Sequence, residues 1–504
     1  MKKNILYIVS GLLMLSSCSM DINDDPNYPT EGDMTASLVF PAVENAVATA
    51  TGDQMFNYGG FFAQYWEQAP TANQYNDLAE LNINEGSQLF DRCYRTIYAG
   101  ALTDIKEILK RDDINSSDRF ACTVMRALAF QLVVDNLGDA PYTEALQGSA
   151  NSQPHWDGGQ AVYEGVLAEL DAAEAELSTG QNLSMTDPLL SKNINKWIGF
   201  ANALRLRMYL RMIDGNINAA EYTSKVKALV AANNFFTGDV AWDVYSDAQG
   251  QFNPWADSFY GSAAIAGTKN LCAAYPIISY QSATADPRIS YGYGPRAKDD
   301  TYVGQLPGSK TLTGDWLGIS SGYNEDYVSM LDYSKSKSMP IYLFTQSELQ
   351  FLIAEVELRF NNNDAAAKAA YEAGVEADFA SKGCTGLMTF LNGSKVNWDG
   401  QTSAAGKLNL IYMQKWVALF YRDHMEAWSE IRRTDVPALS SATAKDIFNS
   451  PAGYNAGDMI EPGVNHINAG GLAKRVPYPS TARQLNSNTP AEKLLSDRVF
   501  WDAK

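Results

Sequence analysis

FTQSELQFLIAEVELRFN, residues 344–361, is the stretch of the chain that decides its fold. Its apolar side chains recur every three or four residues, which predicts a helix with one apolar face. The residues with this spacing are Leu349, Leu352, Val356 and Phe360. The polar run 361–364 predicts a turn, and a second stripe follows it at Ala367, Tyr371 and Val375. The sequence therefore predicts two antiparallel helices, and the small Ala354, Ala370 and Ala373 let them approach closely.

A helix pair of this length and composition resembles a tetratricopeptide hairpin, a unit that stacks against its neighbours to bury its apolar face. Helical spacing also dominates residues 86–111, 158–178 and 218–232, and the stripes 120–132 and 197–212. No strict 34-residue repeat runs along the chain. The predicted fold class is therefore mainly α, a tetratricopeptide-like helical-hairpin scaffold of degenerate units.

The segment from about 236 to 343 breaks this pattern. It is rich in Gly, Pro, Asn, Asp and Ser, yet it also holds many Trp and Tyr residues. A disordered linker would be poor in aromatics, and long ordered irregular segments are usually functional. We therefore expect an irregular, aromatic-rich, ligand-binding subdomain packed on the helices, with residues 60–84 as a smaller version of it.

The N-terminus has the pattern of an exported protein. Lys2 and Lys3 precede an apolar run, 5–15, that is too short to span a bilayer, and two serines follow it. Cys18 then stands where a bacterial lipobox has its cysteine, so residues 1–17 are predicted to be a signal peptide and Cys18 to be lipidated. The acidic residues 18–34 are predicted to be a solvated tether. An ordinary signal peptide with an incidental cysteine stays open as the alternative.

The net charge of the chain, −19, limits its partners. A chain this acidic does not track a phosphate backbone, so nucleic-acid binding is excluded, and its surface does not attract anionic lipid. No later segment has eighteen unbroken apolar residues, so no membrane-spanning helix is expected. Attachment to a membrane is therefore expected to come from the acyl chains on Cys18 alone.

Side chains that carry catalysis or bind metals give no strong signal. The cysteines match no zinc pattern; Cys93 and Cys122 are expected to be buried, and a disulfide between them stays open. The three histidines form no helical metal pair. His424 extends the apolar stripe 410–431 and is expected to be a partly buried histidine at the edge of the core, with a catalytic histidine as the alternative. No metal and no cofactor is predicted.

Residues 318–322, GISSG, match the G-x-S-x-G pattern of a nucleophile elbow but lack the strand before it and the helix after it. We interpret them as a glycine-rich loop. No P-loop or dinucleotide fingerprint is present. Carboxylates are abundant and a glycosidase needs only two, so a surface glycoside hydrolase stays open as an alternative.

The aromatic residues of the irregular segments are the better candidates for a site. A Trp or Tyr ring can cover the C–H face of a pyranose while nearby polar groups bind its hydroxyls. Most such rings are expected to belong to the core. Trp66, Tyr75, Trp255 and Trp316 stand out because polar and glycine-rich neighbours surround them in the sequence.

Several segments, in this order, resemble the SusD/RagB family (SusD-like) of outer-membrane nutrient-binding lipoproteins. They are the lipobox, MRALAFQLVVDNLGDAPYTEAL (125–146), Asp286-Pro287-Arg288, the helix pair, QKWVALFYRDHMEAWSEIRRTDVP (414–437) and RVPYPSTARQLNSN (475–488). The resemblance covers essentially the whole chain after the signal peptide. Asp286, Arg288, Arg432 and Arg433 are expected to serve structure.

The resemblance implies a SusD-like domain over residues 35–504, with four tetratricopeptide-like units and a variable subdomain that carries the site. It implies a lipid-anchored protein at the outer membrane, facing the cell exterior, that passes oligosaccharide to a SusC-like TonB-dependent transporter without catalysis. The regional position of the family's binding residues then favours Trp66, Asn73, Tyr75, Trp255, Tyr260, Tyr293 and Trp316.

Three alternatives stay open beside this glycan-capturing lid. The first is a peptide-capturing lid of the same kind of transporter. The second is the surface glycoside hydrolase. The third is a helical scaffold that binds only other proteins, which the aromatic segments disfavour.

Overall fold

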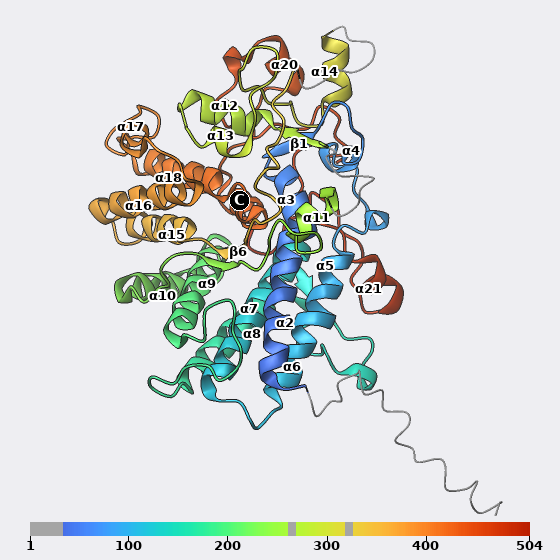
Figure 1. The fold of residues 1–504 in the computed structure, drawn as a ribbon, viewed down its shortest axis with the longest axis vertical. Coiled ribbons are helices and arrows are strands. Elements are labelled where there is room, and N and C mark those ends of the chain that lie inside the picture. Colours follow the sequence, from blue (N-terminus) through green and yellow to red (C-terminus); the bar gives the residue numbers. More distant parts are fainter. Residues whose placement is uncertain (1–33, 261–268, 318–325, 504) are drawn as a thin grey trace, which may run out of the picture.

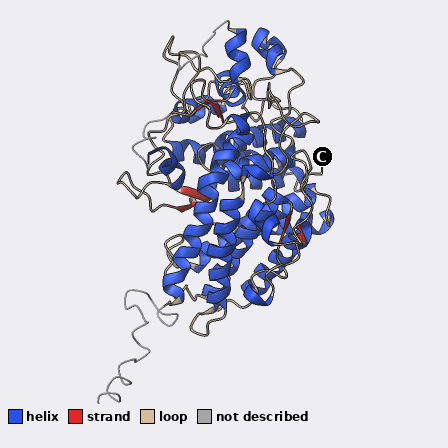
Figure 2. Ribbon diagram, turned by 90° about the vertical axis from the view of Figure 1, so that its right-hand side faces the viewer, coloured by secondary structure: helices blue, strands red, loops and turns tan. Residues whose placement is uncertain are grey.

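The computed structural model describes residues 34–260, 269–317 and 326–503. The predicted signal peptide, Cys18 and the GISSG motif lie outside these residues. Helices make up most of the described chain, and its strands are few and short (Figures 1 and 2). The prediction of a mainly α fold is confirmed.

The first half of the chain combines long helices with short helical elements. In order they are α2 (Ala36–Ala50), the π-helical η2 (Thr51–Met55), α3 (Phe56–Phe62), α4 (Asn76–Ala79), the 3₁₀ turn η3 (Glu85–Ser87), α5 (Asp91–Arg95), the π-helical η4 (Thr96–Leu102), α6 (Thr103–Leu109), α7 (Ser116–Leu137), the 3₁₀ turn η5 (Gly148–Ala150), α8 (Gly159–Ala175), α9 (Ile194–Asp214) and α10 (Ala219–Ala232). The three predicted helical ranges in this half are all present, with 86–111 divided by the π-helical turn.

The second half begins with short elements and then returns to long helices. These are α11 (Pro254–Tyr260), α12 (Tyr275–Ala283), α13 (Ile289–Gly292), α14 (Lys310–Trp316), α15 (Gln346–Arg359), α16 (Asp364–Lys382), α17 (Leu387–Leu391), α18 (Ala404–Leu419), α19 (His424–Thr434), α20 (Ala444–Asn449), the 3₁₀ turn η6 (Pro451–Gly453) and α21 (Ser480–Leu485). The predicted irregular segment 236–343 contains α11 to α14.

Three two-stranded antiparallel sheets join distant parts of the chain. β1 (Trp66–Gln68) pairs with β5 (Leu271–Ala273), β2 (Asp139–Ala140) with β3 (Asp157–Gly158), and β4 (Val240–Trp242) with β6 (Ile341–Phe344). In the first of them Trp66 lies opposite Ala273. This ladder ties the early loop after α3 to the irregular segment two hundred residues later.

The long helices pack as hairpins: α2 with the α5–η4–α6 run, α7 with α8, α9 with α10, and α15 with α16. Figure 1 shows the last two pairs stacked one above the other beside α7 and α8. The quoted stretch forms α15 as predicted, although it begins at Gln346 because Phe344 belongs to β6. A Cβ on Gly374 would lie 2.8 Å from the Phe351 ring, so the close approach of α15 and α16 also depends on a glycine.

Local sequence signals start and stop these helices. Asn115 caps α7 by accepting from the N–H of Asp118, and Gly138, at φ +84°, ends it. Thr345 caps α15 and Asn363 caps α16 in the same manner as Asn115. The predicted turn at 361–364 is therefore also the start signal of the second helix.

The regular spacing of the apolar residues in the stripe 410–431 suggests one helix, but the structure divides this range into two. α18 ends at Leu419 and α19 begins at His424. Between them Tyr421 takes a left-handed φ of 59°, and Asp423 caps α19 by accepting from the N–H of Glu426. The apolar stripe continues across the break because both helices border the same core, which is why the sequence pattern hid the turn.

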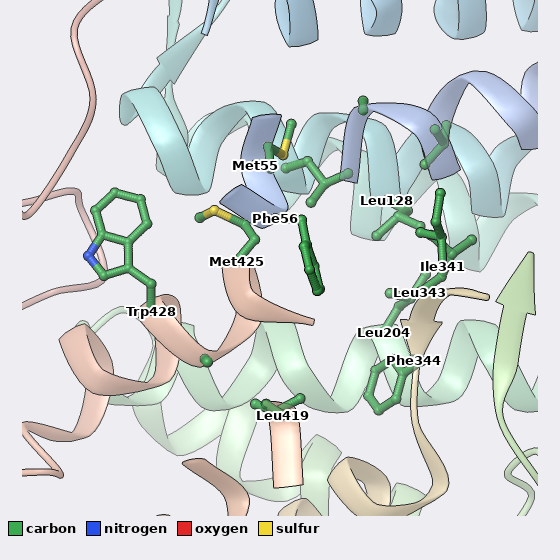
Figure 3. Packing of buried hydrophobic residues seen from close by; sticks show 14 of the residues in the cluster. Met55, Phe56, Leu128, Leu204, Ile341, Leu343, Phe344, Leu419, Met425 and Trp428 are labelled. Carbon is green, nitrogen blue, oxygen red and sulfur yellow. The ribbon is translucent and has the colours of Figure 1, made fainter. Parts of the chain in front are cut away.

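One large core joins the N-terminal hairpins to α18 and α19. Figure 3 shows Phe56 of α3 between Met425 of α19 and the apolar side chains of α7, α9 and β6. A second core lies between α15, α16, α17 and α18. The irregular segment adds a third contact surface, in which Leu306 packs against Ile447 of α20.

A buried ion network runs through the scaffold. Arg207 binds Glu348 at 2.7 Å, and Arg211 binds Asp135 at 2.6 Å and Glu426 at 2.5 Å. These arginines flank the apolar stripe of α9 in the sequence but lie in the interior. The charged groups therefore link α7, α9, α15 and α19 to one another.

The arginines that were expected from the sequence to serve structure also form buried ion pairs or hydrogen bonds. Arg433 binds Glu355 at 2.7 Å, and although burial alone would raise the pKa of Glu355, this guanidinium holds it at about 2. Arg432 donates to the carbonyls of Asp135 and Lys474 rather than to solvent. Buried Arg288 binds Asp286 at 2.6 Å and Asp378 at 2.8 Å, so the Asp-Pro-Arg turn is fixed to α16.

The apolar α7 is the single described helix that has the length and composition to cross a membrane, but 94% of its apolar window is buried within the fold. It serves as a core helix of the hairpin stack. Cys93 and Cys122 are both buried and unpaired, so the disulfide left open by the sequence is absent.

Candidate functional site

Trp66 and Trp255, two of the predicted ligand-binding residues, lie in the core. They are 0% and 1% exposed, and their rings stack on each other 5.3 Å apart and nearly parallel. Both indole N–H groups donate to Asn57 of α3. Their faces are taken up by protein, so neither ring offers a surface to a ligand in this structure.

Tyr293 is also buried, at 2% exposure. Its ring stacks on Phe420 at 4.9 Å, and its hydroxyl donates to the carbonyl of Tyr65. It joins Trp66 and Trp255 in a buried group that we call the aromatic junction, because it connects the irregular segment to α3 and α19. Tyr260 ends α11, and its side chain lies outside what the structure describes.

His424 belongs to the same aromatic junction. It is fully buried, its ring stacks on Phe56 at 3.8 Å, and Nδ1 lies 2.9 Å from the Phe56 carbonyl while Nε2 accepts from the N–H of Tyr421. Burial lowers its pKa to about 3. A neutral ring with both nitrogens engaged is a structural group, so the core interpretation of His424 is confirmed in a more buried form than expected.

The other three predicted residues lie at the surface near α14. Lys310, the first residue of α14, donates to the side-chain oxygen of Asn73 and to the carbonyl of Ala72. Tyr75 is half-buried against Phe61, and burial raises the pKa of its phenol to about 12, so it remains a hydroxyl. The loop after β1 and the start of α14 therefore form one continuous surface.

Trp316 ends α14 and borders a cavity of about 290 Å³. The Lys445 ammonium lies 4.7 Å from its ring centroid and the Phe448 ring lies 5.0 Å away, both from α20. The other lining residues are Leu312, Ser440, Ser441, Ala442, Thr443, Ala444, Glu461, Pro462 and Gly463. Figure 1 shows α14 and α20 side by side at one end of the molecule. We call this the Trp316 cavity.

Backbone pairing holds the walls of the Trp316 cavity together. The N–H of Gly463 donates to the Pro307 carbonyl at 2.8 Å, and that of Val464 to the Gly308 carbonyl at 2.9 Å. Gly308 has φ +55°, and a Cβ there would lie 2.5 Å from Pro462. A glycine is therefore required at this crossing of two segments that are 150 residues apart.

The structure thus leaves Asn73 exposed and Tyr75 and Trp316 partly exposed, and it buries Trp66, Trp255 and Tyr293. Sequence reasoning missed Lys445, Phe448 and Glu461. Thr443 and Asp446 do form a capping box, which signals the start of α20. No local pattern, however, indicates that α20 lies against α14, because that contact depends on the whole fold.

The Trp316 cavity combines one aromatic ring, one ammonium, several hydroxyls and one carboxylate. Such a set can cover an apolar face and bind hydroxyl groups. Within residues 34–260, 269–317 and 326–503, no group of three or more His, Cys, Asp or Glu side chains is placed to hold a metal ion.

Comparison with known proteins gives a consistent result. The SusD-like_2 family, described as "Starch-binding associating with outer membrane", matches residues 26–452. No curated protein matched the chain.

Solved structures with the same fold include a SusD homologue from Bacteroides uniformis, with 21% identity, a TM-score of 0.69 and coverage of 94% of this chain and 100% of that one. A SusD homologue from Bacteroides thetaiotaomicron has 21% identity, a TM-score of 0.68 and coverage of 94% and 99%. A chitin-binding SusD homologue from Flavobacterium johnsoniae has 20% identity, a TM-score of 0.68 and coverage of 93% and 98%.

Proposed function

The chain belongs to the SusD-like_2 family, described as starch-binding and associating with the outer membrane, and from this premise we propose that it is a non-enzymatic surface lipoprotein that captures oligosaccharide at the Trp316 cavity and the adjoining Asn73–Tyr75 loop. The observation that carries this proposal is the half-buried Trp316 ring at the edge of a cavity lined by both apolar and polar residues.

The chemistry of this surface suits a sugar. An indole ring can cover the C–H face of a pyranose, and burial of such a ring supplies binding free energy at small entropic cost. Ser441 and Lys445 are exposed beside it and can bind ring hydroxyls. A solved structure with this fold is described as chitin-binding, which supports a glycan as the class of ligand.

The non-enzymatic part of the proposal rests on the carboxylates. Glycoside hydrolysis normally uses two carboxyl groups facing each other across the bond. Glu461 is the one carboxylate among the described residues that line the Trp316 cavity, and the amide of Asn465 donates to it at 3.1 Å. A single carboxylate suits hydroxyl recognition better than hydrolysis.

We further propose that the protein is a lid that delivers its ligand to a SusC-like TonB-dependent transporter, as the family resemblance implies. The lipid on Cys18 would anchor it to the outer membrane, facing the exterior. The Cys18→Ala variant is then expected to leave the membrane fraction, because the acidic surface has no affinity of its own for anionic lipid. The measurement is fractionation with labelled palmitate, and label entering the variant would contradict the assignment.

Isothermal titration calorimetry tests the ligand class. The purified protein is titrated with starch and chitin oligosaccharides, other glycan oligomers and peptides, alongside Trp316→Ala and, as a control, Met388→Ala at an exposed position of α17. Saturable heat with a sugar that is weakened at least tenfold in Trp316→Ala, but not in the control, supports the proposal.

The alternatives give different results in the same experiment. Heat with peptides alone assigns the protein to the peptide-capturing lids. Release of reducing sugar, stopped by Glu461→Gln, contradicts the non-enzymatic proposal. Sugar binding that is unchanged in Trp316→Ala places the site elsewhere.

A further inference from the structure

A second and larger cavity, of about 750 Å³, lies beside α5. Its described lining comes from η2, the end of η3, α5, η4 and α21, and it shares no residue with the Trp316 cavity. Figure 1 shows α21 next to α5, well below α14. We call it the α5–α21 cavity. Nothing in the proposed function uses it.

Hydrogen bonds fix the far wall of this cavity. The carboxylate of Asp91, in α5, accepts from the N–H groups of Ser480 and Thr481 at 3.0 Å each and from the Ser480 hydroxyl at 2.8 Å. These bonds outweigh partial burial and lower the pKa of Asp91. The Asp91 oxygens are therefore engaged in holding α21 in place.

Two arginines line the cavity, and they differ. Arg92 is paired with Asp53 at 3.0 Å. Arg95, one helical turn along, is exposed, and among the described residues it has no carboxylate or hydrogen-bond partner. In a chain with 58 acidic and 39 basic side chains, a guanidinium that pairs with no carboxylate of its own protein and lies beside a cavity is available to bind an anion there. A guanidinium matches a planar carboxylate with two parallel hydrogen bonds.

A second polar atom also lacks a partner. The side-chain oxygen of Gln54, on η2, is buried at the cavity lining and has no donor within the described residues. A buried oxygen without a donor is destabilising, because it has lost its hydrogen bonds to water without gaining one in the protein. A hydroxyl group on a bound molecule would supply that donor.

Aromatic rings complete the lining. Tyr94 and Tyr98 are neighbours on the α5–η4 helix, with centroids 4.4 Å apart. Trp156 stacks behind Tyr94 at 6.1 Å and 3°, and the Tyr98 hydroxyl donates to the Pro141 carbonyl. Both rings are thus held in position from behind. η2 and η4 are π-helical, a feature frequently found at functional sites.

We infer that the α5–α21 cavity is a second ligand site, which binds a hydroxyl-bearing carboxylate, a uronic acid residue of an oligosaccharide. Arg95 binds the carboxylate, the Gln54 oxygen accepts from a sugar hydroxyl, and Tyr94 and Tyr98 cover the C–H face. The volume is within the range of small-molecule sites, about 300–1,000 Å³. The site does not depend on the proposed function, because none of its residues belongs to the Trp316 cavity.

Calorimetry with defined acidic sugars tests this site. The purified protein is titrated with trimers of galacturonate, glucuronate and mannuronate, and with each trimer as its neutral methyl ester. We expect at least one trimer to bind, and its ester to bind at least tenfold more weakly because the charge that Arg95 recognises is gone.

Variants locate the binding. Arg95→Gln and Gln54→Met are each expected to lower the affinity for the trimer at least fivefold, and Arg95→Gln is expected to have the larger effect. Lys227→Gln, on the exposed face of α10, removes the same charge elsewhere and should leave the affinity unchanged, as should Trp316→Ala. The melting temperature of each variant shows whether it is folded.

Three outcomes overturn the inference. The first is that none of the three trimers gives heat. The second is that the acid and its ester bind equally well. The third is that Trp316→Ala loses binding of the trimer while Arg95→Gln keeps it. The last would assign acidic sugars to the Trp316 cavity and leave the proposed function standing. Conversely, uronate binding lost only in Arg95→Gln supports this site even if no neutral glycan binds at Trp316.

Discussion

The aromatic junction and the Trp316 cavity are built from the same residue types but serve different ends. Trp66 comes six residues after Gly60 and directly before Glu67, and Trp316 directly follows Gly314 and Asp315, so each ring has both glycine and polar neighbours in the sequence. Yet Trp66 is fully buried and stacked on Trp255, whereas Trp316 is half-buried at a cavity. The difference lies in what the glycines do.

Gly60 lets the Trp66 ring lie directly against the backbone of α3. A Cβ at Gly60 would lie only 2.1 Å from an indole carbon. The glycine that suggested an open loop is therefore the reason the ring is buried. A glycine-rich neighbourhood is consistent with either an exposed ring or an unusually close-packed one, and only the tertiary contact decides between them.

Trp66→Ala is the strongest way to break the aromatic junction. It removes a fully buried indole that contacts Phe56, Trp255 and His424. We expect the free energy of unfolding to fall by about 3–5 kcal/mol, measured by urea denaturation. A loss under about 1 kcal/mol would mean that the ring does not hold the irregular segment to the scaffold.

Gly60→Ala tests the close packing of the aromatic junction without removing the Trp66 ring. The added methyl group overlaps the Trp66 indole, and overpacking of this kind costs about 1–3 kcal/mol. Denaturation of Gly60→Ala beside Gly453→Ala, where a Cβ meets nothing within 4 Å, separates overpacking from the general effect of a glycine substitution. Equal stability of the two variants would contradict the close packing.

The buried His424 predicts a pH dependence. Its pKa falls from 6.5 to about 3 on folding because burial disfavours the charged ring, so between those pH values the unfolded chain binds a proton that the folded chain does not. The free energy of unfolding therefore loses up to about 1.4 kcal/mol per pH unit as pH falls through this window. Asp423, whose pKa burial raises to about 7, acts in the opposite direction.

Because the two groups act in opposite directions, the contribution of His424 to the pH dependence is obtained by comparing the wild type with a variant that lacks the imidazole. Denaturation of the wild type and of His424→Gln at pH 4, 5, 6 and 7 gives two slopes, and the wild-type stability should fall more steeply toward low pH. Parallel slopes would show that His424 is protonated in the fold.

Trp316→Ala should have the smallest effect on stability. The ring contacts Lys445 and Phe448 but lies at the surface, so we expect a change in unfolding free energy within about 1 kcal/mol. Differential scanning calorimetry measures it on the same samples used for ligand titration. A loss of more than about 3 kcal/mol with ligand binding intact would place Trp316 in the core with Trp66.

The scaffold was largely predictable because its signals are local. The apolar spacing of residues 344–361 and the cap of α7 at Asn115 both act within a few turns of helix. The stripe 410–431 misled because α18 and α19 share one core, and the left-handed Tyr421 between them has no sequence signature of its own.

For the candidate site, the sequence predicted which segments of the chain contribute but not which residues come into contact. Lys310 joins α14 to Asn73, and residues 307–308 pair with 463–464 at the wall of the Trp316 cavity. These contacts join residues that are 156 to 237 positions apart in the sequence, and no periodicity encodes them. For the same reason the Lys445 side of the Trp316 cavity was missed.

The buried ion network has a consequence for how this sequence can diverge. Removing one partner of a buried pair costs about 3–5 kcal/mol, a large share of the 5–15 kcal/mol that holds a typical domain folded. Single substitutions at Arg207, Glu348, Arg433 or Glu355 are therefore expected to be strongly destabilising, and replacement of both partners together is the change that the fold tolerates best. Descendants of this chain should show Arg207 varying together with Glu348, and Arg433 with Glu355, while the exposed aromatic residues drift independently with the ligand.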